Sequence, residues 1–204
     1  MSKISALLQN PDKANIVDVY ADGEYVMSVT EDTAFDAGLK IGKPLDVDTL
    51  EQIERSTMLV KAKAKAYNYL SYGDMSANTL KTKLARAGFD NEISDLCVCA
   101  MIDSGYINDE RYASSLANYL ATVKNYGPRR IEQEMFLKGI SGELAQNAID
   151  ALEVDFCETI KAHIPKSFDY SDKKSRDKLC AALVRRGFDF DTINYVIKEP
   201  DDFE

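Results

Sequence analysis

The sequence contains a single histidine, His163, among 204 residues. A Ser-His or Cys-His catalytic pair would have to use this side chain, which lies beside Ile164 and Pro165 near an expected helix end. The sequence also lacks a Gly-rich phosphate loop, a nucleophile elbow and the HExxH zinc motif. We therefore predict no catalytic residue and no enzymatic activity.

The four cysteines do not form a metal-binding pattern. Cys97 and Cys99 are two positions apart, so on a helix they point in different directions, and Cys157 and Cys180 stand alone. A zinc site needs cysteine pairs with two to four intervening residues, or a second histidine. We predict no metal and no cofactor, and we interpret the cysteines as small core residues.

Long apolar runs are absent as well. No stretch approaches the roughly 20 apolar residues that cross a bilayer as a helix. Residues 1–5 lack the apolar core of a signal peptide. We expect a cytoplasmic protein that makes no membrane contact.

Negative charge dominates the chain but is unevenly distributed. The formal net charge is −9 at pH 7. Residues 1–60 carry 5 basic and 11 acidic residues, whereas residues 166–188 carry seven basic residues and three aspartates. An acidic chain binds a polyanion poorly without help, so tight binding to bare nucleic acid is disfavoured. A local basic face remains available.

One pattern occurs three times along the chain. In each copy, apolar residues stand four and eight positions before a glycine, and another apolar residue follows it directly. The glycines, Gly88, Gly139 and Gly187, are 51 and 48 residues apart. Such a glycine ends a helix in a left-handed conformation, and the apolar residue after it packs back on the helix. Recurrence at this spacing predicts a tandem array of one helical unit. The apolar residues are Leu80, Leu84 and Phe89; Ile131, Met135 and Ile140; and Leu179, Leu183 and Phe188.

Capping residues and glycines divide the array into helices. Pro128 suits a first helical position, and Ser76, Asp90, Asn108 and Ser141 suit N-caps. The expected helices span 49–72 with a break at 55–57, 77–87, 91–103, 109–123, 128–138, a helix from 142 that runs as far as His163, 173–186 and 190–198.

The first 45 residues have a different pattern. Asp22-Gly23 lies between partly alternating runs and predicts a β-hairpin with a type I′ turn. Residues 1–13 are expected to be frayed. Residues 40–45 are interpreted as a turn with a short third strand, because a hairpin alone is only marginally stable in water.

The fold class predicted from these elements is mainly α. Tandem three-helix repeats form an elongated curved array, with a small N-terminal β-hairpin segment. The predicted divisions are a β-hairpin extension over 1–56, repeat 1 over 57–105, repeat 2 over 106–155, and repeat 3 with an acidic tail over 156–204.

Cations stand beside the glycines of the repeats and at two helix starts. Those in a last helical turn complement the helix dipole, but Arg129 and Arg130 stand at a helix start, where the dipole disfavours them. Two explanations stay open for this pair: an intermolecular contact, or pairing with Glu132, Glu134 or a neighbouring helix. The candidate partner-binding residues are Arg86, Arg111, Tyr126, Arg129, Arg130, Lys138, Lys173, Lys174, Arg176, Arg185 and Arg186.

Several motifs over residues 60–198 resemble the RecX family, the bacterial regulators of the RecA recombinase. The segment around Asp22-Gly23-Glu24-Tyr25 also resembles the N-terminal extension of RecX proteins from Gram-positive bacteria. The motifs are Leu70-Ser71-Tyr72, Leu84-Ala85-Arg86-Ala87-Gly88-Phe89-Asp90, Gly105-Tyr106-Ile107-Asn108-Asp109-Glu110-Arg111-Tyr112-Ala113, and Tyr126-Gly127-Pro128-Arg129-Arg130-Ile131 with Lys138-Gly139-Ile140.

The resemblance implies a regulatory protein without enzymatic activity. It implies a protein that binds in the groove of the RecA filament on single-stranded DNA, contacts more than one protomer, and inhibits strand exchange and ATP hydrolysis. We expect the protein to be a monomer. Because this chain is acidic overall, we expect it to contact the recombinase and disfavour direct contact with the DNA. The alternative is a helix-turn-helix DNA-binding repressor. That reading requires a recognition helix rich in Arg, Asn and Gln, which 91–103, 141–152 and 190–198 do not supply.

Overall fold

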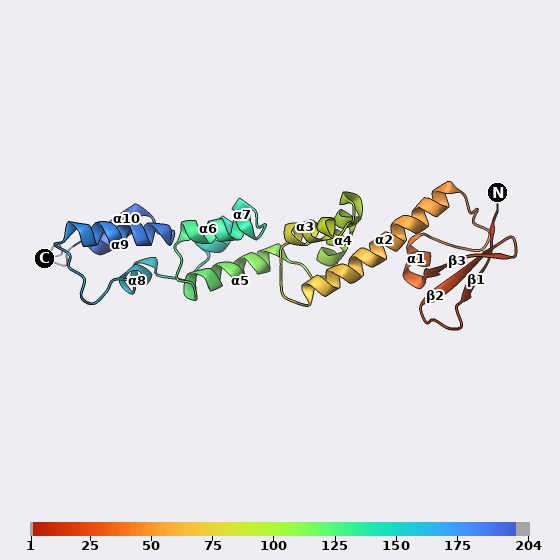
Figure 1. The fold of residues 1–204 in the computed structure, drawn as a ribbon, viewed down its shortest axis with the longest axis horizontal. Coiled ribbons are helices and arrows are strands. Elements are labelled where there is room, and N and C mark those ends of the chain that lie inside the picture. Colours follow the sequence, from red (N-terminus) through yellow and green to blue (C-terminus); the bar gives the residue numbers. More distant parts are fainter. Residues whose placement is uncertain (1, 199–204) are drawn as a thin grey trace. The chain divides into compact units, whose positions relative to one another are not determined.

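The computed structural model describes residues 2–198. Over these residues the chain is mainly helical, with one three-stranded antiparallel sheet near the N-terminus (Figure 1), and the predicted fold class is confirmed. Backbone contacts divide the chain into two units. Unit 1 comprises Met1–Asp74 and Leu80–Ile107, and unit 2 comprises Met75–Thr79 and Asn108–Glu204. The acidic tail predicted at 199–204 lies outside the described residues.

The sheet has the strand order β1-β2-β3, formed by β1 (Ile4–Gln9), β2 (Ile16–Ala21) and β3 (Glu24–Thr30). Strands β2 and β3 form the predicted hairpin. Asp22 and Gly23 both have positive φ, at 53° and 90°, as a type I′ turn requires. Helix α1 (Glu31–Asp36) follows β3 directly and is capped by the Thr30 side chain.

Two predictions for the N-terminal segment are wrong. Residues 4–9 are a paired strand and not a frayed end, and this strand supplies the third strand that was expected at 40–45. Ile4 is 1% exposed and anchors the small core of unit 1 with Val19, Val29 and Ile53. Residues 40–45 are not a strand: they meet residues 2–4 through an isolated bridge between Lys3 and Pro44 and three backbone hydrogen bonds. Strand β1 covers one edge of β2 and thereby stabilises the otherwise marginal hairpin.

Helix α2 (Val47–Leu70) is uninterrupted, so the predicted break at 55–57 is wrong. Ile53 and Ala62 lie on its buried face on either side of that point. The expected boundary between 56 and 57 therefore falls within a helix, and the division of the chain into four segments stays a prediction. Unit 1 is completed by most of α3 (Ala77–Arg86) and by α4 (Asn91–Asp103), which packs against α2.

Unit 2 holds two successive groups of three helices. The first group is α5 (Asp109–Thr122), α6 (Pro128–Leu137) and α7 (Gly142–Asp150), and the second is α8 (Phe156–Lys161), α9 (Lys173–Arg185) and α10 (Phe190–Ile197). Each group has its own buried core, around Ile131 and Met135 in the first and around Leu183 and Phe188 in the second.

The helix expected from residue 142 to His163 is two helices. Helix α7 ends at Asp150, and a separate α8 begins where the Asp155 side chain accepts hydrogen bonds from the N–H groups of Cys157 and Glu158. A strong N-cap within the predicted helix therefore divides it.

All three repeat glycines end their helices as predicted. Gly88, Gly139 and Gly187 have φ values of 95°, 77° and 93°. In each case the N–H after the glycine donates to a carbonyl oxygen five residues earlier: Phe89 to Leu84 at 3.2 Å, Ile140 to Met135 at 3.1 Å, and Phe188 to Leu183 at 3.2 Å. This is the Schellman pattern, so the three-helix units share one local design.

Candidate functional site

The start of α6 docks on the end of α9 within unit 2 (Figure 1). The N–H of Gly127 donates to the carbonyl oxygen of Arg186 at 2.9 Å, and the N–H of Arg129 donates to that of Gly187 at 3.1 Å. The first N–H groups of a helix and its last carbonyl groups have no partner within their own helix. These two hydrogen bonds give partners to two N–H groups at the start of α6 and to two carbonyl groups at the end of α9.

Two glycines make this docking possible. A Cβ atom on Gly127 would lie 2.5 Å from the carbonyl carbon of Gly187 and from the nitrogen of Phe188. A Cβ atom on Gly187 would lie 2.8 Å from the Cα of Arg130 and still closer to its nitrogen. Any side chain at either position would therefore push the two helix ends apart.

The docking brings four arginines from distant parts of the sequence to one place. Arg129 and Arg130 begin α6, and Arg185 and Arg186 end α9. We call these four residues the arginine junction. Arg129 and Arg185 are exposed, and their side chains form no ion pair within the described part of the chain. The Arg186 guanidinium donates to the carbonyl oxygen of Lys124 at 3.4 Å.

Arg130 is held by its own helix and by the residue before the turn. Its guanidinium pairs with Glu134 at 2.6 Å and lies over the ring of Tyr126, 5.7 Å from the ring centre. Of the two explanations left open for the Arg129–Arg130 pair, local pairing therefore applies to Arg130, and its partner is Glu134. Tyr126 is half-buried beneath this cation.

Asp189 is the second carboxylate near the junction. It caps α10 by accepting hydrogen bonds from the Thr192 N–H at 2.8 Å and from the Thr192 hydroxyl at 2.6 Å. These two hydrogen bonds lower the pKa of Asp189 below its ordinary value, and the positive charge of Arg129 lowers it further. Even with Glu132 counted beside Glu134 and Asp189, the four guanidinium groups outnumber the nearby carboxylates.

The remaining candidate cations do not join this site. Lys173, Lys174 and Arg176 stand at the opposite end of α9 from Arg185, about 18 Å away for a helix of this length. The basic residues counted over 166–188 therefore do not gather at one place. The other candidates are all exposed: Lys138 after the end of α6, Arg111 at the start of α5, and Arg86 in unit 1.

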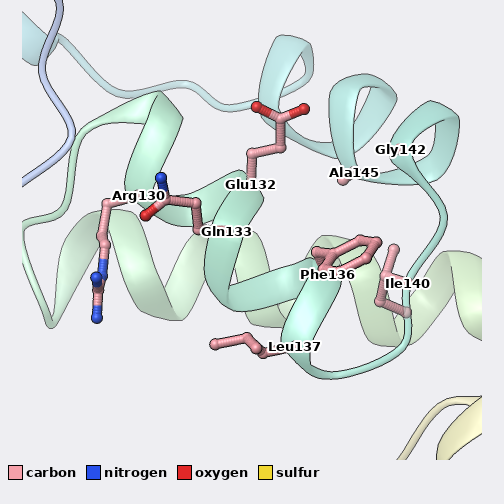
Figure 2. Close-up of a pocket in the computed structure, with 8 residues that line it drawn as sticks. All are labelled: Arg130, Glu132, Gln133, Phe136, Leu137, Ile140, Gly142 and Ala145. Atoms are coloured by element: carbon pink, nitrogen blue, oxygen red, sulfur yellow. The ribbon is translucent and has the colours of Figure 1, made fainter.

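A shallow apolar hollow of about 440 Å³ adjoins the junction on α6 and α7. Figure 2 shows Arg130 at one end of the hollow and Phe136 and Ile140 at the other. Phe136 and Leu137 are 74% and 75% exposed. We did not predict this hollow, although a signal was present: Met135 fills the core, so the two apolar residues after it must point elsewhere. Exposed apolar side chains beside arginines are typical of a protein-binding surface.

Neither a metal site nor a membrane-spanning helix is found among residues 2–198. No group of three or more His, Cys, Asp or Glu side chains among residues 2–198 is arranged to hold a metal ion. No helix in the described part of the chain combines the length and apolarity needed to cross a membrane.

Comparison with known proteins gives one consistent family. The family model described as RecX, second three-helix domain, matches residues 108–149, which hold α5, α6 and α7. A regulatory protein RecX from Clostridioides difficile is 28% identical over 98% of this chain and 94% of its own length. One from Streptococcus uberis is 30% identical over 82% of this chain and 66% of its own length.

Solved structures show the same fold. A crystal structure described as regulatory protein RecX superposes with a TM-score of 0.81 at 22% identity, covering 98% of this chain and 100% of that chain. A crystal structure of RecX from Lactobacillus salivarius gives a TM-score of 0.63 at 24% identity, covering 69% of this chain and 95% of that chain.

Proposed function

Because the chain belongs to the RecX family, we propose that it binds the filament that the RecA recombinase forms on single-stranded DNA. Binding lowers the recombinase and ATPase activities of that filament. The observation that carries this proposal is the arginine junction, in which Arg129 and Arg185 are exposed and without ion pairs among the described residues.

The chemistry of the surface favours a protein partner over bare DNA. The junction offers a few cations next to the exposed Phe136 and Leu137, a combination suited to an interface with an apolar centre and a charged rim. Binding to DNA alone requires many phosphate contacts, and the net charge of −9 opposes it. Single-stranded DNA is therefore a contact made within the filament and not a separate ligand.

Inhibition follows from occupancy of the filament and not from catalysis by this chain. A bound protein that contacts more than one recombinase protomer stabilises the filament state that it binds and shifts the population away from the active state. The regulatory effect then depends on concentration and saturates when the sites on the filament are filled.

The third helices of the units argue against the helix-turn-helix alternative. In helix-turn-helix proteins of this class the last helix enters the major groove and needs cationic or amide side chains on its exposed face. Helices α4, α7 and α10 contain no lysine or arginine and one or two amide side chains each, which is too few for such a recognition helix. A gel shift on bare duplex DNA separates the two functions, because the proposed regulator leaves the duplex unshifted at concentrations that inhibit the filament.

The direct test is a titration of the protein against preformed recombinase filaments while ATP turnover is measured. The test variant is Arg129→Glu with Arg185→Glu, because both side chains are exposed and neither forms an ion pair among the described residues. The control is Lys13→Glu with Lys40→Glu, which reverses two exposed charges in unit 1. We expect half-inhibition at a concentration at least tenfold higher for the test variant and unchanged for the control. Equal inhibition by both variants would overturn the proposed surface.

A further inference from the structure

Two of the three repeat glycines, Gly139 and Gly187, lie at helix ends that the start of another helix covers. The donors are side-chain hydroxyls at the Gly139 end and backbone N–H groups at the Gly187 end. The end of α9 is covered by the start of α6, as described above. The end of α6 is covered by residues just before and in the first turn of α3: the hydroxyls of Ser76 and Thr79 donate to the carbonyl oxygen of Lys138 at 2.6 and 2.9 Å. A Cβ atom on Gly139 would lie 2.8 Å from the Ser76 hydroxyl oxygen. The contact is thus a recurring one in which a helix start docks on a glycine end.

The third glycine end, at Gly88, is open. A Cβ atom built on Gly88 would meet no atom within 4 Å, and Ala87 and Gly88 are both exposed. The structure gives no hydrogen bond to the carbonyl oxygen of either residue from within residues 2–198. The equivalent carbonyl groups at the other two ends accept the docking hydrogen bonds.

A groove of about 690 Å³ adjoins this open end within unit 1. Its floor includes Met58, Phe89 and Ile93, which are apolar. Its rim is acidic, and the only cation that lines it, Arg55, is already paired with Glu92. The acidic residues that line it are Asp48, Glu51, Glu54, Asp90 and Glu92.

The chain also carries an exposed helix start in which three cations outnumber the flanking Asp172 and Asp177. Helix α9 begins after its capping residue Asp172, and Lys173, Lys174 and Arg176 in its first turn are exposed. The capping residue of α9 stands 15 positions before Gly187, whereas that of α6 stands 12 positions before Gly139. Helix α9 is therefore about one turn longer, from its cap to its glycine, than α6. Its first-turn cations lie beyond the position at which the starts of α3 and α6 dock.

We propose that the start of α9 in one copy of the chain docks on the open Gly88 end and its acidic groove in a second copy. This head-to-tail contact repeats between molecules an arrangement that occurs twice within the chain, in which a helix start covers a glycine end. The cations of the α9 start outnumber its flanking aspartates and face an acidic groove. A heterologous contact of this kind leaves one open end on each side and so continues from copy to copy. The inference goes beyond the proposed function and does not depend on it.

The association is weak and sensitive to salt. Each chain carries a net charge of −9, so two chains repel each other at long range while the docking surfaces attract each other locally. Salt shortens the reach of both effects, and the local ion pairs are exposed enough to weaken with it. The monomer expected from the sequence is therefore the species at low concentration.

Sedimentation velocity of the full chain over rising concentrations tests the proposal. The variant Lys173→Glu with Lys174→Glu reverses the helix start, and the variant Glu51→Lys with Glu54→Lys reverses the groove. We expect the wild-type chain to associate in a concentration-dependent way, and each variant alone to associate at least tenfold more weakly. An equimolar mixture of the two variants associates again, because each supplies the surface that complements the other.

The control is Lys13→Glu with Lys40→Glu, which also reverses two lysines and leaves both docking surfaces intact. It should associate like the wild type. A wild-type chain that stays monomeric at every concentration overturns the proposal. Association that survives in both variants overturns it as well, because the contact then belongs to another surface such as the hollow at Phe136.

Discussion

Gly187 lies against the backbone of Arg130 so closely that no side chain fits between them. This contact joins the end of α9 to the start of α6, and it sets where the four guanidinium groups of the arginine junction lie. A residue that is chemically inert therefore determines the geometry of the charged surface.

Gly187→Ala should destabilise unit 2 more than Gly88→Ala destabilises unit 1. Both glycines have nearly the same backbone conformation, with φ of 93° and 95°. An alanine in the left-handed conformation costs about 1–2 kcal/mol, and this cost applies to both variants. Only at Gly187 does the added methyl group also collide with the Arg130 backbone. Urea unfolding of the two variants measures the difference, and equal losses of unfolding free energy would contradict the close packing.

The two arginines that begin α6 should respond differently to replacement by alanine. Arg130→Ala removes the ion pair with Glu134 and the stacking on Tyr126, with an expected loss of about 0.5–1.5 kcal/mol in unfolding free energy. Arg129→Ala should leave the stability unchanged within about 0.5 kcal/mol, because the side chain is exposed and the helix dipole disfavours a cation there.

The same pair separates stability from binding. Arg129→Ala should weaken inhibition of the recombinase filament without a change in thermal unfolding, and it should raise the pKa of Asp189 towards its ordinary value. Titration of the Asp189 carboxyl carbon by NMR checks the second effect. An unchanged Asp189 titration would show that Arg129 does not act on that carboxylate.

Local features of this fold could be read from the sequence. The capping residues Asp90, Asn108 and Ser141 each accept the expected hydrogen bond from the third residue after them. The glycine ends follow the same logic, because a Schellman ending needs only residues within six positions. These predictions succeeded because the determining interactions lie within one or two helical turns.

Features that depend on distant pairing could not be read in this way. Strand β1 was missed because no tight-turn signal links it to β2, whose partners range from Val17 for Gln9 to Ala21 for Ile4, and because its sequence alternates poorly. Arg129 and Arg130 are cations that the helix dipole disfavours, and on this ground the sequence indicated the start of α6 as a candidate site. Their meeting with Arg185 depends on Gly127 and Gly187, which the sequence indicated only as a turn and a helix end.

The apolar hollow should contribute to binding and little to stability. Phe136→Ala with Leu137→Ala removes two side chains that are about three-quarters exposed. We expect the concentration for half-inhibition of the filament to rise at least tenfold. The unfolding free energy should change by less than about 1 kcal/mol, because both positions are exposed. Met135→Ala is the matched control from the same helix, because removing this buried side chain should lower the unfolding free energy by about 2–5 kcal/mol. A double variant that inhibits like the wild type would remove the hollow from the binding surface.

The cap of α10 should make the stability of the last helix fall in acid. The hydrogen bonds from Thr192, together with the charge of Arg129, lower the pKa of Asp189 in the folded state. A carboxyl group with a lowered folded pKa contributes stability that is fully present above its ordinary value of about 3.9. That contribution is lost as the pH falls through the folded pKa.

Asp189→Asn keeps an oxygen acceptor but cannot titrate. The unfolding free energy of this variant should therefore be lower than that of the wild type at neutral pH, and it should change less between pH 5 and pH 2. Unfolding of wild type and variant across this range, followed by α10 amide signals, measures the difference. Parallel pH profiles for the two proteins would show that Asp189 is not linked to folding.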